Sequence, residues 1–228
     1  MIVMKDDFKL VASLIGDPVR ATVLWELLDG KAFTATELAI AADTSASNIS
    51  MHLSKLMNAG LLVAESQGRH RYYKYATQET AYAVEALSTL IPPSSKKVKT
   101  VTAITPIQQC RTCYDHLAGK TGVAITDAML KQRLIMLKEN GFALTKKGDQ
   151  WFNDLHIDTA SLQVQRRSFL RPCLDWSERR YHIAGSLAAA FLNKMLQQDW
   201  LRTTKNSRVI IVTAKGQKQL YDKLKVIV

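Results

Sequence analysis

The chain has 228 residues, more than a typical single domain, and this length predicts two domains. Hydrophobic residues make up 47% of the chain, which is enough for a buried core and excludes a wholly disordered protein. No apolar run approaches the roughly 20 residues that span a bilayer, and the opening MIVMKDDFKL lacks the long apolar stretch of a signal peptide. We therefore expect a cytoplasmic protein that has no membrane partner.

The net charge of +11 favours an anionic partner, but the charge is unevenly distributed. Residues 1–100 contain 11 Lys and Arg against 10 Asp and Glu, whereas the remaining residues contain 20 against 10. Within the nearly neutral first part, the segment from Arg69 to Lys74 has three cations and no acid. This segment is predicted to be a basic tip.

The first part of the chain is predicted to form consecutive short helices. An apolar stretch at residues 7–16 comes first. Asp17 and Pro18 match an N-cap followed by proline at the first helical position, and the apolar spacing after them predicts a helix. Either Thr34 or Thr36 is expected to cap the next helix.

A third helix is predicted from about Ala46 to Ala59, with Ile49, Leu53 and Leu56 facing inward. Its other face is small and polar, as entry into the DNA major groove requires, because bulky side chains would prevent close approach. We predict that this helix and the residue before it contact DNA through Ser45, Ser47, Asn48, Ser50, Met51, His52 and Lys55. For His52, packing or a phosphate contact is favoured over metal ligation.

Two strands are predicted after this helix, in the segments LLVAESQ and RYYKYA, on either side of a turn at Gly68. Such a hairpin beside a helix-turn-helix is a wing. Arg69, His70 and Arg71 lie at its tip, and the arginines can reach phosphates or the minor groove.

The strings DPVRATVLWELL, TATELAIAADTSASNISMHLSKLMNAGLL and GRHRYYKYA resemble the ArsR family of dimeric repressors, over roughly residues 8–90. The resemblance implies that residues 45–58 are the recognition helix and that double-stranded DNA with an inverted-repeat operator is the partner. It also implies a homodimer formed by the first helix and by a helix at about 78–90. The familiar metal-sensor residues are missing, because TELAIAADTS has no cysteine and QETAYAVEAL has neither cysteine nor histidine. Any signal must therefore enter elsewhere.

A linker is predicted at residues 92–105, where two prolines, small polar residues and charges follow one another. It separates a DNA-binding and dimerisation domain, residues 1–91, from a sensory domain, residues 106–228. We expect a mainly α fold with small β-hairpins (α+β): an N-terminal winged helix-turn-helix, then a C-terminal domain of two winged-helix-like repeats.

The repeats are predicted at about residues 110–160 and 173–228. The string His-Leu-Ala-Gly at position 116 matches His-Ile-Ala-Gly at position 182, each expected to open a helix. About thirty residues later, each half has a Thr-x-x-Gly turn that is expected to begin a further helix.

The second half also contains the residues best suited to receive a signal. Cys110, Cys113 and His116 would lie within about a 120° arc if that segment were helical. Together with Cys173 and His182, they suit a tetrahedral site for zinc or another thiophilic metal, although the sequence makes no cofactor certain. They also suit a thiol switch or a purely structural role.

A small-molecule effector is a further hypothesis, because Trp176 and Arg179 lie in a stretch that mixes acid, base and indole. The sequence lacks the phosphate-loop, nucleophile-elbow and His-Glu-x-x-His motifs, so we predict that the chain is not an enzyme and assign no catalytic residue. The expected function is a dimeric repressor released from its operator by an effector, thiol or metal signal. The alternative is a cofactor- or metal-binding enzyme that uses the Cys/His residues, with the helix-turn-helix as an interaction module.

Overall fold

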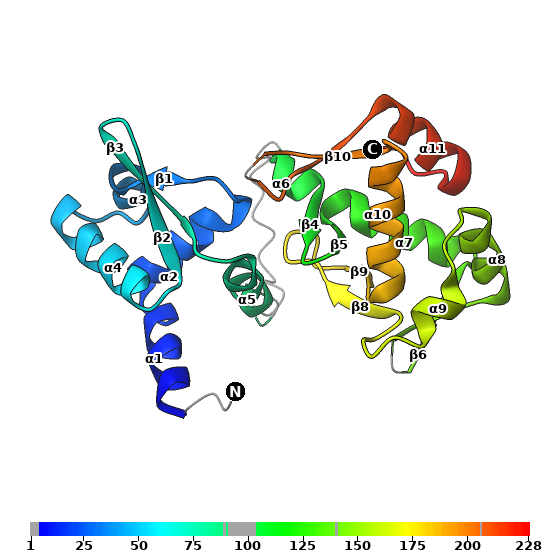
Figure 1. Cartoon of the computed structure of the whole chain (residues 1–228), viewed down its shortest axis with the longest axis horizontal. Helices are drawn as coiled ribbons and strands as arrows, with labels where there is room; N and C mark the ends of the chain where they lie inside the picture. The colour runs from blue at the N-terminus through cyan, green and yellow to red at the C-terminus, as the bar shows by residue number, and fades with distance from the viewer. Residues whose placement is uncertain (1–4, 89, 91–103, 140, 206) are drawn as a thin grey trace. The chain divides into compact units, whose positions relative to one another are not determined.

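In a computed structural model, the chain folds as two compact units, residues 1–88 and 89–228 (Figure 1). The structure describes residues 5–88, 90, 104–139, 141–205 and 207–228. The predicted linker therefore lies outside the described residues, apart from 104 and 105. Helices and small antiparallel hairpins dominate both units, which confirms the predicted α+β class. Among the helices of the described residues, none is long and apolar enough to cross a membrane.

The N-terminal unit is a helical core with one small sheet. Its elements are α1 (Lys5–Ile15), α2 (Pro18–Glu26), the short 3-10 helix η1 (Leu27–Asp29), β1 (Phe33–Thr34), α3 (Ala35–Ala41), α4 (Ala46–Asn58), β2 (Leu62–Gln67), β3 (His70–Tyr75) and α5 (Gln78–Ser88). The strands form an antiparallel sheet in the order β1-β3-β2. The predicted helix-turn-helix is α3 and α4, and the predicted wing is β2 and β3.

Local capping explains where these helices begin. The Asp17 side chain accepts a hydrogen bond from the Arg20 backbone N–H at 3.0 Å, and Pro18 is the first residue of α2. Of the two candidate threonines, Thr34 caps α3, in a reciprocal capping box with Glu37. Each start is set by residues close in sequence, so these starts were predictable.

The inward face of α4 forms the centre of the N-terminal core. Ile49, Leu53 and Leu56 are fully buried, as their spacing predicts. The other buried apolar residues of this core come from α2, η1, α3, the wing and α5: Val23, Leu24, Leu27, Leu28, Leu38, Ala39, Leu62, Tyr73 and Val84. Burying one face of α4 in this way leaves its opposite face to solvent.

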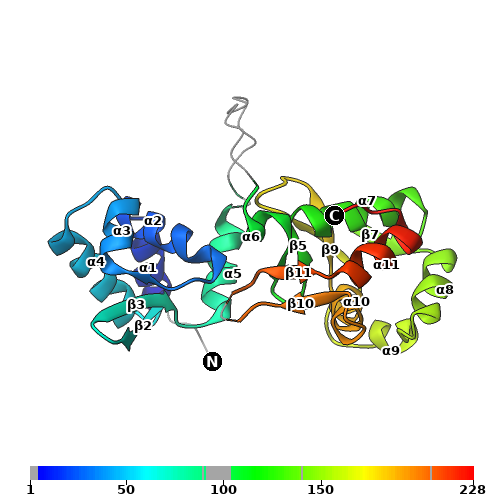
Figure 2. The ribbon, with the colours of Figure 1, turned by 90° about the horizontal axis from the view of Figure 1, so that it is seen from above.

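The C-terminal unit repeats one order of elements: hairpin, helix, hairpin, helix (Figure 2). After α6 (Pro106–Gln109), the first repeat contains β4 (Arg111–Cys113), β5 (His116–Ala118), α7 (Gly119–Lys131), β6 (Ile135–Lys138), β7 (Gly141–Leu144) and α8 (Lys146–Asp154). After α9 (Thr159–Gln163), the second contains β8 (Arg171–Leu174), β9 (Tyr181–Ala184), α10 (Ser186–Gln197), β10 (Leu201–Thr203), β11 (Ile210–Val212) and α11 (Ala214–Leu224).

The duplication extends to single residues at the Thr-x-x-Gly turns. Thr145 caps α8 by accepting from the Gly148 N–H, and Thr213 caps α11 by accepting from the Gly216 N–H, both at 2.9 Å. A Cβ on Gly148 would lie 1.9 Å from a backbone oxygen, and one on Gly216 would lie 2.0 Å from the equivalent oxygen. Glycine is required at both positions because the backbone approaches so closely.

The two repeats share one hydrophobic core. Helix α7 packs against strand β9 of the other repeat, and α10 packs against β5, while β5 and β9 lie beside each other. A direct link crosses between the repeats where the Ile183 N–H donates to Thr126 Oγ1 at 3.0 Å. The first hairpins of both repeats thus meet at the middle of the unit.

The structure differs in detail from two local expectations in this unit. The segment from Cys110 to His116 is not helical, because α6 ends at Gln109 and the chain continues as the hairpin β4–β5. The histidines do not open helices either. His116 and His182 are strand residues, and each helix begins only at or after the glycine of the His-x-Ala-Gly string.

Candidate functional site

The solvent face of α4 carries most of the residues predicted to contact DNA. Ser45, Ser47, Ser50, Met51 and Lys55 are exposed. Asn48 is half-buried, and its side chain donates to Thr44 Oγ1 at 2.7 Å. The exposed serines are short, so the helix can approach a groove closely.

His52 does not belong to this face. Its side chain is buried, and its Nδ1 lies 3.4 Å from Asp17 Oδ1 and 3.4 Å from Arg20 Nη1. Arg20, which sequence patterning did not single out, is itself buried and donates from Nε to the Leu14 carbonyl at 2.6 Å. His52 therefore has a packing role, and its assignment as a DNA contact is corrected.

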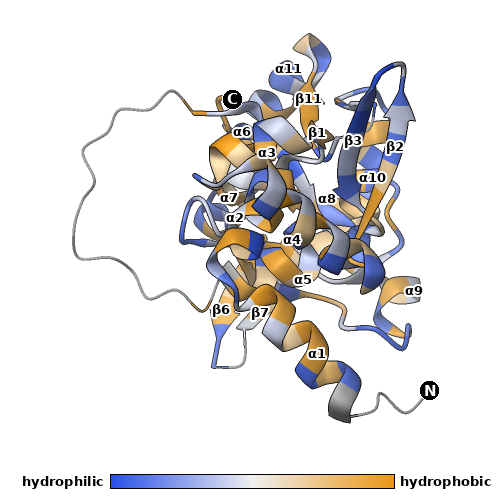
Figure 3. Cartoon of the chain, turned by 90° about the vertical axis from the view of Figure 1, so that its left-hand side faces the viewer, coloured by the Kyte–Doolittle hydropathy of each residue, from blue (hydrophilic) through white to orange (hydrophobic). Residues whose placement is uncertain are grey.

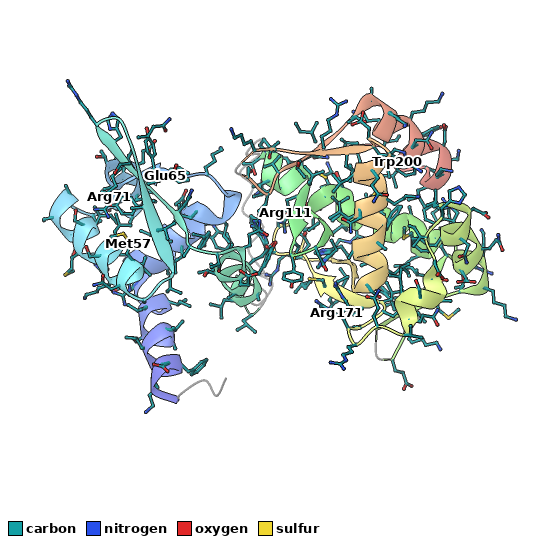
Figure 4. All side chains as sticks on the ribbon, viewed as in Figure 1. Met57, Glu65, Arg71, Arg111, Arg171 and Trp200 are labelled. Carbon is teal, nitrogen blue, oxygen red and sulfur yellow. The ribbon has the colours of Figure 1, made fainter. Side chains whose placement is uncertain are left out.

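The wing presents its basic tip to solvent. Arg69, His70 and Arg71 are all exposed, and Figure 3 shows β3 as largely hydrophilic. Arg71 reaches back to α4, where its Nη2 lies 3.7 Å from Met57 Sδ (Figure 4). Its guanidinium also lies 5.6 Å from the Tyr73 ring centroid. The contact between Arg71 and Met57 joins the wing to α4.

A second candidate site lies in the C-terminal unit, where four potential metal ligands converge. Cys113 and His116 are paired across the hairpin β4–β5, and Cys173 and His182 are paired in the same way across β8–β9. One ligand atom from each of the four lies within 4.8 Å of all the others. Each repeat thus supplies one thiol and one imidazole to a common point.

Two of the distances among these four atoms match the edges of a tetrahedral metal site. Zn–S bonds of about 2.3 Å and Zn–N bonds of about 2.0–2.1 Å imply tetrahedral edges of about 3.8 Å between sulfurs and about 3.3 Å between nitrogens. The Cys113 and Cys173 Sγ atoms are 3.9 Å apart, and the Nε2 atoms of His116 and His182 are 3.2 Å apart. The donor set is also the borderline-soft combination that zinc and related ions prefer.

The protonation equilibria of the cluster favour a thiolate beside imidazoles. The hydrogen bond with the Cys113 thiol lowers the pKa of Cys173 most, and contacts with His116 and His182 lower it further, although burial opposes them. Burial alone would lower the pKa of His116, but the Asp115 carboxylate and Cys173 raise it above its usual value. Thiolate is the form of cysteine that binds metals.

A carboxylate lies near the Nδ1 atom of each histidine. Asp115 Oδ1 lies 3.3 Å from His116 Nδ1, and Asp175 Oδ2 lies 3.5 Å from His182 Nδ1. Each aspartate follows its own repeat's cysteine by two positions, so both repeats carry Cys-x-Asp. Carboxylates hydrogen-bonded to the far nitrogen orient metal-binding histidines and leave Nε2 free to coordinate. Asp115 makes such a hydrogen bond to His116, whereas Asp175 lies near His182 Nδ1 without one.

Asp175 has a larger set of partners than Asp115. Its Oδ2 accepts from Arg111 Nη2 at 3.0 Å and from the Gly119 N–H at 2.7 Å, and both charged side chains are fully buried. Its Oδ1 accepts from Ser177, through both the hydroxyl and the backbone N–H. Burial would raise the pKa of Asp175, but the Arg111 charge and these donors hold it below its usual value.

Three residues predicted for this site lie apart from the four converging atoms. Cys110 is buried outside the cluster, and burial raises the pKa of its thiol to about 12. The Trp176 ring instead lies 4.9 Å from the Arg111 guanidinium. Arg179 belongs to the turn between β8 and β9, where its N–H donates to the Asp175 carbonyl at 2.9 Å.

Comparison with known proteins agrees with the architecture of the N-terminal unit and extends over both units. A family model described as a helix-turn-helix domain matches residues 15–64. The HTH-type transcriptional regulator YdfF of Bacillus subtilis is 37% identical over 215 residues, which cover 94% of this chain and 95% of that protein. The winged fold, the recognition helix and these matches define a DNA-binding transcriptional regulator. The chain belongs to the ArsR family of winged helix-turn-helix regulators.

Other relatives match a smaller share of the chain. The HTH-type transcriptional regulator CmtR of Mycobacterium tuberculosis is 38% identical over 73 residues, 32% of this chain and 61% of that protein. Among solved structures, HlyU from Vibrio cholerae is 22% identical over 40% of this chain and 100% of its own, with a TM-score of 0.36. The cadmium metal-sensor CMTR is 29% identical over 42% of this chain and 98% of its own, with a TM-score of 0.33. The curated relatives YdfF and CmtR are described as transcriptional regulators, which supports the prediction of a non-enzyme.

Proposed function

We propose that the protein is a homodimeric repressor that binds an inverted-repeat operator and is released from it by a thiophilic divalent metal, with zinc as the type ion. The observation that carries this proposal is the convergence of two cysteines and two histidines, whose sulfur–sulfur and nitrogen–nitrogen distances match the edges of a tetrahedral zinc site. The metal site lies in the duplicated half, so the signal would enter outside the DNA-binding domain.

DNA contact through α4 and the wing is supported by the exposed polar face of α4 and by the basic wing tip. Replacing both Arg69 and Arg71 with alanine should weaken binding to all duplexes and reduce the salt slope by about 2. Ser47→Ala should instead alter operator preference. The measurement is a mobility-shift titration on duplex DNA from upstream of the protein's own gene, at several salt concentrations. An unchanged salt slope in the double arginine variant would exclude this wing assignment.

Homodimerisation is supported by apolar side chains that remain exposed on the two helices flanking the DNA-binding elements. Phe8 and Leu10 on α1 are 68% and 55% exposed, and Leu87 on α5 is 42% exposed. Sedimentation equilibrium should give a dimer mass for the wild type and a monomer mass for Phe8→Asp. Tyr221→Asp, at an exposed apolar position on α11, is the matched control and should remain dimeric. A monomeric wild type would refute the dimer.

The metal would be held by Cys113 and His116 from one repeat and by Cys173 and His182 from the other. Bound there, it would supply a doubly charged centre that fixes both thiolates and joins the two repeats. Asp115 and Asp175 would orient the imidazoles from behind. Structural sites of this closed four-ligand type contribute folding free energy directly.

Cobalt(II) titration of the metal-free, reduced protein tests this site. Wild type should bind one equivalent and develop thiolate charge-transfer absorption together with the intense visible bands of tetrahedral cobalt, which zinc then bleaches. Cys113→Ser and His182→Ala should lose these bands. Cys110→Ala is the matched control and should retain them, because Cys110 lies outside the cluster. A wild-type spectrum without thiolate bands would refute the proposed metal site.

A further inference from the structure

The two cysteines of the cluster form a pair that a metal is not required to explain. Cys113 and Cys173 lie 60 positions apart in the sequence, yet their sulfurs are 3.9 Å apart. Neither residue is fully buried. A disulfide bond is about 2.05 Å long. To form one, the two sulfurs would have to move closer together by a distance shorter than that bond.

We propose that Cys113 and Cys173 are a site of oxidative modification by a hydroperoxide. One sulfur, as thiolate, attacks the peroxide oxygen. The O–O bond breaks, the departing alkoxide or hydroxide takes up the proton, and the attacking sulfur becomes a sulfenic acid. The second sulfur then attacks the first, the S–S bond forms, the S–O bond breaks and water leaves. In total, two thiols are oxidised to one disulfide. An alkyl hydroperoxide is reduced to one alcohol and one water, and hydrogen peroxide is reduced to two waters.

The remaining cysteine, Cys110, is excluded from this reaction by its burial and position. Cys110 is 2% exposed and lies outside the group of converging ligand atoms. It occupies the position before β4, three residues from Cys113, where side chains of an extended chain point to the opposite face. The disulfide therefore joins β4 to β8, across the two repeats, and leaves one free thiol.

The oxidised pair and a bound metal exclude each other, and this consequence rests on the proposed metal function. A disulfide removes two of the four donors, and the remaining two imidazoles cannot complete a four-coordinate site. The duplicated half would then respond to a second class of signal: hydroperoxide would eject the metal and replace it with a covalent link between the same two strands.

The test begins with metal-free, reduced protein and an equimolar amount of hydrogen peroxide. Titratable thiols under denaturing conditions should fall from three to one. The intact mass should decrease by two hydrogen atoms, and peptide mapping should link Cys113 to Cys173. Cys110→Ala should form the same link, whereas Cys113→Ser should stop at a sulfenic acid that dimedone traps. The proposal is overturned if all three thiols remain titratable after peroxide treatment, or if the link involves Cys110.

A second arm with zinc-loaded protein separates this proposal from the metal function. Peroxide should release one zinc ion for each pair of thiols lost, as measured with a chromogenic chelator. If the metal-free protein forms the Cys113–Cys173 link but binds no zinc, the oxidation site stands and the metal function fails. If zinc binds but no link forms at any peroxide concentration that leaves the methionines intact, the oxidation site fails and the metal function stands.

Discussion

The two repeats of the C-terminal unit each supply one cysteine and one histidine to the cluster, but the carboxylates beside the histidines differ in their surroundings. In the first repeat, Asp115 is partly exposed and pairs with Arg167, whose side chain is 42% exposed. In the second, Asp175 and its partner Arg111 are both fully buried. One carboxylate therefore belongs to the surface and the other to the core.

The two repeats have the same hairpin register but different surroundings for the carboxylate. The register of each first hairpin is preserved, because it places a cysteine opposite a histidine in both repeats. The surroundings have diverged, since Asp175 also accepts from the first N–H of α7. A change at the second repeat's histidine would thus act on a helix of the first repeat, whereas the Asp115 arm ends in an ion pair near the surface.

The largest expected effect sharpens this contrast. Asp175→Asn should destabilise the C-terminal unit by about 3–5 kcal/mol, because it leaves the Arg111 charge buried without its counter-ion. Asp115→Asn is the matched control and should cost clearly less, because Asp115 and Arg167 are both partly exposed to solvent. Urea unfolding of the two full-length, metal-free variants measures both. Equal losses of stability would mean that the buried Asp175 and the partly exposed Asp115 stabilise the unit to the same extent.

A smaller and more symmetrical effect is expected at the Thr-x-x-Gly turns. Gly148→Ala and Gly216→Ala should each destabilise the unit by about 1–3 kcal/mol, since each new Cβ meets a backbone oxygen. Gly60→Asn in the N-terminal unit is a control, because a Cβ there meets no atom within 4 Å and asparagine tolerates its positive φ. Unfolding midpoints compare the three. A neutral Gly216→Ala beside a costly Gly148→Ala would show that the repeats are not equivalent here.

The smallest expected effect is on folding stability at low pH. Hydrogen bonds and ion pairs with His116 and Arg167 overcome burial and hold the folded-state pKa of Asp115 at about 2, below its ordinary value of 3.8. A depressed pKa contributes stability that is complete above 3.8 and is lost as the pH falls toward 2. Between pH 5 and pH 3, Asp115→Asn should therefore lose less stability than the wild type, as followed by urea midpoints. Parallel losses would mean that Asp115 is not stabilised as an anion in the fold.

Much of the N-terminal unit was predictable because its signals are local. Asp17 before Pro18, the Thr34–Glu37 capping box and the spacing of the apolar residues of α4 each specify an element from neighbouring residues. The burial of His52 was not predictable in this way. It depends on Asp17 and Arg20, which lie more than thirty positions earlier in the chain.

In the C-terminal unit, the matching strings predicted the duplication but not the geometry of the cluster. The spacing of Cys110, Cys113 and His116 suits one face of a helix, so three residues were grouped where the hairpin brings only two together. The hairpin turn places Tyr114 at a φ of 59°, a conformation that tyrosine seldom adopts and that no local pattern indicates. The convergence of the two cysteine–histidine pairs depends on packing between strands some sixty positions apart, which one sequence does not reveal.

Operator affinity measured with and without zinc tests the central claim most directly. With reduced wild-type protein, zinc is expected to raise the dissociation constant for the operator duplex by at least about fivefold relative to a chelator-treated sample. Cys110→Ala is expected to respond in the same way, while Cys113→Ser and Cys173→Ser bind the duplex but do not respond. Identical affinities for wild type with and without zinc, in a sample shown to contain one bound zinc ion per chain, would contradict metal control of DNA binding from the duplicated half.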